Sequence, residues 1–289
     1  YSAAAVVGPI VAGALVALLP IPTFMLIDAT SFLFSAITLG LVRTSFNAVD
    51  SEPREKKSIL RDVVEGLRYV LGHPVLRNIS AMMAMVNFVS TTVATQLVFF
   101  AKVRLDATDS QVAWLFSAES IGVVILSLAA GPLRKRWRFS TVALGALMLN
   151  GLLTIALAFT QFYWAALVLV AINSGLGILF NINTGSLRQA IVPNEMLGRV
   201  ISIAGVLAWS AIPVGAFLGG LAIERTHDVV LVYAVIGVLT FLIPLFFSFT
   251  PLGHAERYIP GTAAQGRGVG VAGEPAPVQG ETAPETTNV

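Results

Sequence analysis

Long apolar stretches decide the fold of this chain, and one of them, residues 162–185, reads FYWAALVLVAINSGLGILFNINTG. It contains no charged residue and exceeds the roughly 20 residues that a helix needs to cross a bilayer. Working outward from it gives eight long apolar stretches, at residues 1–20, 23–42, 78–103, 110–132, 140–160, 162–185, 200–223 and 229–250. The sequence therefore predicts an all-α polytopic membrane bundle of about eight transmembrane helices.

The positive charges follow the alternation of these stretches. Of the 18 Lys and Arg residues, the three that fall on one side of the predicted membrane are Lys102, Arg104 and Arg225, and the remaining 15 fall on the other. Because cytoplasmic loops are enriched in Lys and Arg, the basic side is predicted to be cytoplasmic, and so are both ends of the chain. A bacterial plasma membrane is the location that we expect.

The composition excludes several other classes of protein. Hydrophobic residues make up 56% of the chain and charged residues 12%, about half the charged share of a typical soluble domain. The chain has no Cys, and its three His lie in separate connections, so neither a metal site nor a cofactor is expected. Motifs of ATP-driven pumps and hydrolases are also absent from the sequence, and the basic residues mark membrane topology, so we expect neither an enzyme nor a nucleic-acid partner.

The lengths of the connections divide the chain into four parts. Residues 1–42 hold two spans, residues 43–77 form the longest connection, residues 78–250 hold six closely connected spans, and residues 251–289 are rich in Gly, Pro, Ala and Thr and are predicted to be disordered. Within the connection, apolar residues recur every three or four positions between Leu60 and Leu71, with Ser58 as an N-cap and Pro74 as a stop. This pattern predicts an amphipathic helix, either on the cytoplasmic membrane face or packed as a linker against the bundle.

Small residues and prolines form recurring motifs in the spans and their connections. The first span contains Gly8, Pro9 and Gly13. The seventh span contains a similar set of residues, Pro213, Gly215 and Gly219. Such residues allow helices to approach closely. Further motifs follow the fourth span at Gly131, Leu133 and Arg136, and the sixth span at Arg188, Gly198 and Arg199.

These motifs resemble those of the major facilitator superfamily, in particular its drug and siderophore exporters of the enterobactin-exporter and macrolide-efflux type. The likeness covers the carboxyl-terminal two thirds of such a transporter, with the eight spans as helices five to twelve. Since the chain opens with Tyr1 inside an apolar stretch, we expect four further helices of the same protein to precede it. One departure is Lys135, which replaces the acidic residue of the family's Gly-x-Leu-x-Asp-Arg-x-Gly loop, so a latch through that acid is not carried over.

Two carboxyl groups within the spans are candidates for proton coupling. Glu119 lies near the middle of the fourth span, where a charge is costly, so this group can exchange a proton near neutral pH. A structural hydrogen bond is the alternative. Asp28 in the second span begins a stripe with Ser31, Ser35 and Thr38, and a structural role is favoured for it.

Amide and hydroxyl side chains on two other spans predict a substrate cavity, because unpaired amides are costly in lipid. The candidates are Asn87, Thr91 and Gln96 on the third span, and Asn173, Asn181 and Asn183 on the sixth. In the superfamily that the chain resembles, these spans border the central pathway. Hydrogen bonding between helices without substrate contact is an open alternative for each residue.

The resemblance implies part of a secondary active transporter that exports small organic molecules in exchange for protons, by alternating access. Its expected partners are the lipid bilayer, a small-molecule substrate, protons and the preceding helices. Two alternatives stay open: a carrier for uptake or facilitated diffusion, and a non-transporting membrane protein of the same fold.

Overall fold

A computed structural model describes residues 21–41 and 59–258, and every structural statement below refers to these residues. All regular elements in these two ranges are helices, with no strand among them. They are α2 (Ile21–Leu41), α3 (Ile59–Gly72), α4 (Pro74–Thr95), α5 (Leu97–Arg104), α6 (Asp109–Arg136), α7 (Phe139–Phe159), α8 (Tyr163–Ile191), α9 (Asn194–Trp209), α10 (Ala211–Thr226), α11 (Val229–Ser248) and the 3-10 helix η1 (Pro251–Tyr258).

Five spans within the described residues are long and apolar enough to cross a membrane, or six if α4 and α5 count as one. The all-helical membrane fold is thereby confirmed, and the described residues hold five or six such spans where the sequence predicted seven of its eight. The first predicted span lies outside the described residues. The second corresponds to α2, whose apolar part, Met25–Leu41, is shorter than a full span.

Two of the predicted spans are interrupted. The third bends by 49° where α4 meets α5, at Gln96. The seventh runs from Asn194 to Thr226, longer than predicted, and divides at Ser210 into α9 and α10. Pro213 explains this second break, because it offers no N–H to the preceding turn.

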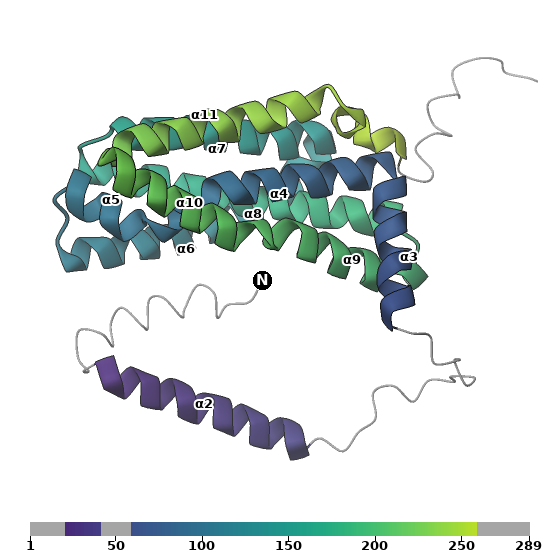
Figure 1. Ribbon diagram of the computed structural model, residues 1–289, viewed down its shortest axis with the longest axis horizontal. Coiled ribbons are helices and arrows are strands. Elements are labelled where there is room, and N and C mark those ends of the chain that lie inside the picture. Colours follow the sequence, from purple (N-terminus) through teal and green to yellow (C-terminus); the bar gives the residue numbers. More distant parts are fainter. Residues whose placement is uncertain (1–20, 42–58, 259–289) are drawn as a thin grey trace, which may run out of the picture.

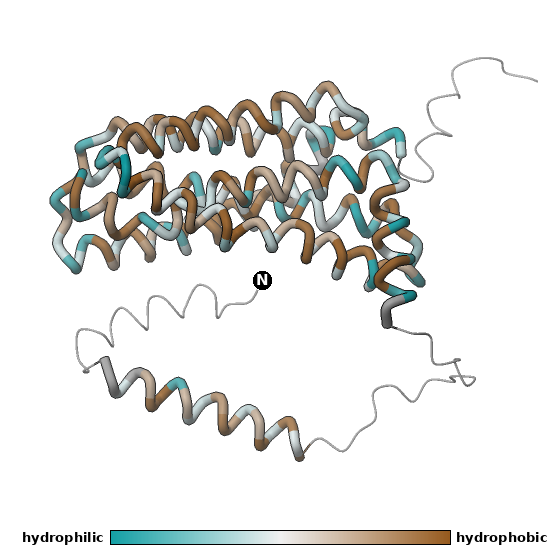
Figure 2. Tube along the Cα trace, in the orientation of Figure 1, coloured by the Kyte–Doolittle hydropathy of each residue, from teal (hydrophilic) through white to brown (hydrophobic). Residues whose placement is uncertain are grey.

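The long helices run along one common axis and connect through short turns (Figure 1). The most extensive contacts join α6 to α8 and α7 to α11, with α10 packed against α4. Figure 2 shows hydrophobic residues along the length of these helices and many hydrophilic residues at the two ends. Large apolar side chains such as Leu128, Phe217 and Phe246 are exposed on the outside. An apolar exterior of this kind is what a lipid environment requires.

Helix α3 lies across one end of the bundle (Figure 1). It ends at Gly72, one residue before His73 caps α4 and Pro74 begins it. Val70 is fully buried in a cluster with Leu76, Val192 and Val200. The helix predicted in the connection is therefore present and packed against the bundle, while the predicted cap, Ser58, lies outside the described residues.

The segment after the last span differs from the prediction of disorder over its first eight residues. These residues form η1, in which Leu252 and Ala255 are buried. Glu256 Oε1 accepts hydrogen bonds from the Ser140 N–H at 2.9 Å and the Ser140 hydroxyl at 2.8 Å, at the start of α7. Two buried apolar side chains and one helix cap hold this segment in place. So few residues do not form a pattern that can be recognised in the sequence, next to the Gly- and Pro-rich residues that follow. Residues 259–289 lie outside the described residues.

Candidate functional site

A polar pocket lies inside the bundle among α4, α6, α7 and α8. Its volume is about 260 Å³. Polar side chains reach it from all four helices, namely Ser90, Glu119, Asn150, Thr154, Asn173 and Ser174. The pocket lies between the spans rather than at their ends, and residues of the apolar helices such as Val93, Leu157 and Val170 complete its lining.

Glu119 supplies the carboxyl group of this pocket. It lies about 15 Å along α6 from Asp109, which is half of a bilayer's apolar thickness. Its Oε1 accepts a hydrogen bond from the Ser174 hydroxyl of α8 at 3.2 Å. Within residues 21–41 and 59–258, no Lys, Arg or His forms an ion pair with Glu119. A carboxyl group inside a membrane bundle with a neutral partner suits proton uptake and release.

Amides and a hydroxyl form a second part of the pocket. Asn173 Nδ2 donates to Thr154 Oγ1 at 3.0 Å, and Asn150 Nδ2 donates to the Asn173 carbonyl at 2.9 Å. Thr154 Oγ1 in turn donates to the Asn150 carbonyl at 2.9 Å. The Asn173 side-chain oxygen is buried and has no protein partner. A buried acceptor without a partner is uncommon in folded proteins.

Two glycines bring α6 and α8 together beside Glu119. A Cβ on Gly122 would lie 1.7 Å from the Ala171 carbonyl oxygen, and one on Gly175 would lie 2.6 Å from the Gly122 carbonyl oxygen. Only glycine fits at such a crossing. Gly122 is one turn from Glu119 and Gly175 follows Ser174, so this crossing sets the distance of the hydrogen bond between them.

The predicted cavity residues of the third span do not line this pocket. Asn87 Nδ2 donates to the Ala208 carbonyl of α9 at 2.9 Å, which is a contact between helices. The Thr91 carbonyl accepts from the Thr95 hydroxyl. Gln96 lines a different pocket, of about 550 Å³, between α5, α10 and the start of α11.

The predicted cavity residues of α8 separate into different environments. Asn173 lines the Glu119 pocket. Asn181 has an exposed side chain, whereas Asn183 is fully buried and donates to the Leu179 carbonyl of its own helix at 2.7 Å. Asp28 is exposed on α2, which lies apart from the other helices in Figure 1. The structure thus brings Asn173, but not Asp28, Asn181 or Asn183, to Glu119.

The small-residue motif of the seventh span faces α4. A Cβ on Gly215 would lie 2.0 Å from the Phe88 carbonyl oxygen, and one on Gly219 would lie 1.8 Å from Thr92 Oγ1. Thr92 Oγ1 also donates to the Gly215 carbonyl at 3.2 Å. Pro213 lies in the first turn of α10. The matching motif of Gly8, Pro9 and Gly13 lies outside the described residues.

The motifs predicted for the cytoplasmic loops all lie in helices. Gly131, Leu133 and Arg136 occupy the last turns of α6, and Gly198 and Arg199 lie in α9. Arg188, in the last turn of α8, donates from Nη2 to Met83 Sδ of α4 at 3.0 Å.

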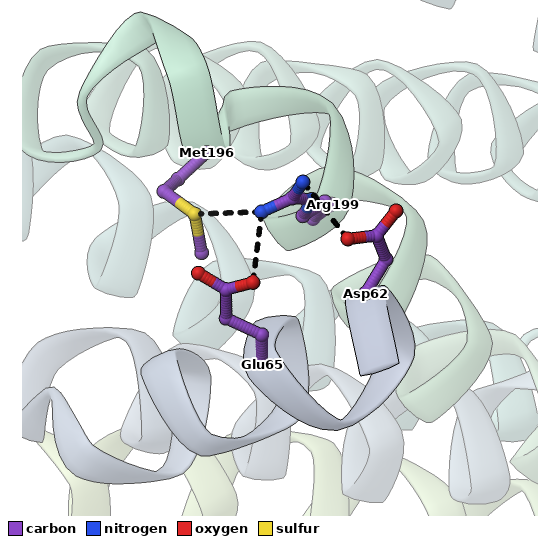
Figure 3. A network of polar contacts seen from close by, with 4 residues as sticks. All are labelled: Asp62, Glu65, Met196 and Arg199. Atoms are coloured by element: carbon purple, nitrogen blue, oxygen red, sulfur yellow. Dashed lines mark hydrogen bonds and ion pairs between the residues drawn. The ribbon is translucent and has the colours of Figure 1, made fainter. Parts of the chain in front are cut away.

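Arg199 joins α9 to α3 through two carboxylates (Figure 3). Its Nη2 lies 2.9 Å from Asp62 Oδ1 and its Nη1 lies 3.1 Å from Glu65 Oε2. Nη1 also lies 3.5 Å from Met196 Sδ. The positive charge thus ties the crossing helix to the bundle.

Sequence reasoning did not single out Ser90, Asn150, Thr154 and Ser174 as pocket residues. Asn150 carried a usable signal, because it is an amide within the apolar stretch 140–160. Ser174 carried none, because serine is common in membrane helices and its role depends on the crossing of α6 and α8.

Comparisons with known proteins agree with this arrangement of helices. The chain matches the family described as transmembrane secretion effector over residues 1–269. It is 27% identical over 222 residues to the multidrug efflux pump Tap of Mycolicibacterium fortuitum, a match that covers 74% of this chain and 52% of Tap. It is 26% identical over 263 residues to the uncharacterized MFS-type transporter YfiS of Bacillus subtilis (strain 168), covering 87% of this chain and 62% of YfiS.

The chain thus spans between half and two thirds of the length of these curated relatives. Both relatives are transporters, and the predicted resemblance to the major facilitator superfamily is confirmed. The family match covers most of the chain, so it is sufficient by itself to assign the family. The chain belongs to the transmembrane secretion effector family of the major facilitator superfamily, which consists of membrane transporters and not of enzymes.

Proposed function

We propose that this chain is part of a proton-coupled exporter of small organic molecules that works by alternating access in a bacterial plasma membrane. The observation that carries the proposal is Glu119, a carboxyl group with a hydroxyl partner and no cation, lining a polar pocket inside the bundle. A drug-like or siderophore-like substrate fits the family and the function that the name of Tap gives for that pump.

The proposed mechanism uses the carboxyl group as the point where proton and substrate compete. When Glu119 is ionised, the pocket offers a negative charge to a substrate with cationic or hydrogen-bond donor groups. When Glu119 is protonated, the charge is gone and such a substrate binds less tightly. A proton that enters from the more acidic outer side thus favours substrate release there, which is the requirement for antiport.

The proposed topology places the end that carries α3 and η1 on the cytoplasmic side. The described residues at this end include Arg77, Arg136, Arg138 and Arg257, whereas Lys102, Arg104 and Arg225 lie toward the opposite end. We assign the described spans to helices six to twelve of a twelve-helix fold, with the stretch 1–20 as helix five. On this assignment residues 1–42 belong to the first bundle, residues 43–77 join the two bundles, and residues 78–250 form the second.

An accumulation assay tests the proposal. Cells that express the complete gene are loaded with a panel of fluorescent drugs and iron chelators, with and without a protonophore. The proposal expects lower accumulation of at least one compound, and restoration of its level by the protonophore. Export that persists unchanged without a proton gradient would contradict proton coupling, and uptake in place of export would contradict the direction.

A further inference from the structure

Helix α3 has one face that is fully engaged with the bundle. Val70 is completely buried, and a Cβ on Gly66 would lie 3.3 Å from the Arg199 Cβ and 3.2 Å from the Ile203 side chain. Asp62 and Glu65 both pair with Arg199. This face holds α3 in place, so the opposite face has a fixed orientation.

The opposite face combines exposed apolar and cationic side chains. Val64 is 54% exposed and Leu71 is 48% exposed. Arg61 and Arg68 are exposed as well. Residues 61, 64, 68 and 71 follow one another at three- and four-residue spacing and therefore share one side of a helix. An apolar strip bordered by cations is typical of a helix that lies in a membrane interface.

A shallow pocket of about 300 Å³ lies on this face between the two arginines. It is lined by Arg61, Val64, Glu65 and Arg68. Glu65 already pairs with Arg199, whereas Arg61 and Arg68 form no ion pair with any residue that the structure describes. Two cations seven residues apart are about 10 Å apart along the helix axis, a separation that a phospholipid headgroup and its neighbour can bridge.

The position of α3 favours a membrane surface as the occupant of this face. The helix lies across the bundle end, so its axis runs along the plane of the bilayer when the long helices cross it (Figure 1). The same end carries further cations, among them Arg77, Arg138 and Arg257. An anionic leaflet complements this concentration of positive charge.

We propose that Arg61 and Arg68 bind the phosphates of anionic phospholipids, while Val64 and Leu71 insert at the boundary between headgroups and acyl chains. The proposal relies on the topology given above, in which this end of the bundle is cytoplasmic. It does not rely on substrate export or on Glu119. Arg199 contributes indirectly, because it neutralises Glu65 and turns the anchored face of α3 toward the bundle.

A lipid titration tests the role of the two arginines. The full chain in detergent micelles is titrated with phosphatidylglycerol, and bound lipid is counted by native mass spectrometry. Replacement of both arginines, R61Q/R68Q, is expected to weaken the tightest phosphatidylglycerol binding by roughly 30-fold, whereas phosphatidylcholine binding stays unchanged. The matched control is R225Q, an exposed arginine at the other end of the bundle, which is expected to leave the tightest binding intact.

Further arms separate the possible sources of the phosphate. Inorganic phosphate that competes with phosphatidylglycerol at a similar concentration would assign the site to a free anion and overturn the proposal. Equal loss of binding in R61Q/R68Q and R225Q would also overturn it, because the effect would then be one of net charge. Thermal unfolding of each variant in the same detergent confirms that it is folded before the comparison is made.

A probe of depth tests the insertion of the apolar residues. The natural chain has no Cys, so V64C carries a single label. In vesicles that contain phosphatidylglycerol, a fluorescent label at V64C is expected to be quenched by quenchers attached to lipid chains. The control is E195C, an exposed site in the first turn of α9 at the same end, where weaker quenching is expected. If V64C is shielded from both lipid and aqueous quenchers, another helix or a second copy covers this face and the proposal fails.

Discussion

The two settings in which this chain places carboxyl groups differ in their partners. Glu119, inside the bundle, accepts a hydrogen bond from a neutral hydroxyl of Ser174. Asp62 and Glu65, at the end of the bundle, both face the guanidinium of Arg199. Within the described residues, the carboxyl group inside the bundle therefore has no cationic partner, whereas the two at the end of the bundle share one guanidinium. The ion pairs at the end of the bundle join helices, and the carboxyl group inside it is the one to test for proton exchange.

The largest expected effect comes from the helix crossing that positions Glu119. G122V would place side-chain atoms where the Ala171 carbonyl oxygen lies, so α6 and α8 must separate. We expect a loss of at least about 3 kcal/mol in stability, because the obstacle is backbone and cannot rotate away. The measurement is thermal unfolding of the purified chain in detergent.

Gly145 in α7 provides the matched control for this substitution. A Cβ at Gly145 meets nothing within 4 Å, so G145V is expected to change the unfolding temperature little. Equal destabilisation by the two variants would show that the crossing is not the cause. The position of Glu119 beside the Ser174 hydroxyl would then not depend on the contact between α6 and α8.

The next effect concerns the proposed role of Glu119 in proton coupling. E119Q retains an acceptor for the Ser174 hydroxyl but cannot release a proton, so we expect export driven by a pH gradient to fall to the level of cells without the gene. The assay uses the complete gene, with surface expression measured in parallel. E195Q, at an exposed carboxyl group in the first turn of α9, is the control and should export normally. If E119Q exports as well as the natural protein under a pH gradient, Glu119 has a structural role and does not couple export to protons.

The sequence was sufficient to find Glu119 but not its surroundings. A single carboxyl group in an apolar stretch is visible without a structure, because few residues are so costly in lipid. Its partner Ser174 and the amides Asn150 and Asn173 meet through the crossing of three helices, and the glycines that set this crossing have no distinctive local pattern. Asn173 and Gly177, four residues apart on α8, both line the pocket. Asn181 follows at the same spacing but lies about 12 Å farther along α8 than Asn173, where its side chain is exposed.

The fold was more predictable than the site, for a physical reason. Apolar length and the alternation of charge reflect the bilayer, which acts on every span in the same way. Breaks within spans depend on local contacts instead. Pro213 marks the break at Ser210, but Gln96 gives no comparable warning of the 49° bend between α4 and α5.

A smaller effect on stability is expected when the two ion pairs of Arg199 are removed. Its side chain is 29% exposed, and those of Asp62 and Glu65 are 34% and 47% exposed, so solvent weakens both ion pairs. R199Q should therefore cost about 1 kcal/mol, and the unfolding temperature should fall by a few degrees at low salt. In about 1 M NaCl, where charges are screened, the difference from the natural chain should shrink. R225Q is the control, and an R199Q effect that is independent of salt would point to lost packing rather than lost charge.

The smallest effect concerns His73, which lies outside the spans and like Glu119 has a neutral partner. Its Nδ1 accepts a weak hydrogen bond from the Leu76 N–H at 3.4 Å at the start of α4. Burial lowers the pKa of the His73 imidazole below its ordinary value of 6.5. The unfolded chain therefore takes up a proton at a higher pH than the folded chain does. Stability is thus unaffected above about pH 6.5 and falls as the pH drops from there toward the lower pKa of the folded state.

Protonation of His73 also removes the acceptor that caps α4, so the expected loss at pH 5.5 is below about 1 kcal/mol. The comparison is between the unfolding temperatures at pH 7.5 and pH 5.5 for the natural chain and for H73N, in which the amide caps the helix without titrating. A smaller difference between the two pH values in H73N is the expected result. If both proteins lose the same stability on acidification, other groups titrate and the neutral cap has no part in it. A smaller pH effect in H73N would show that an ionisable group with a neutral partner responds to pH outside the membrane. E119Q tests the same relation inside the membrane.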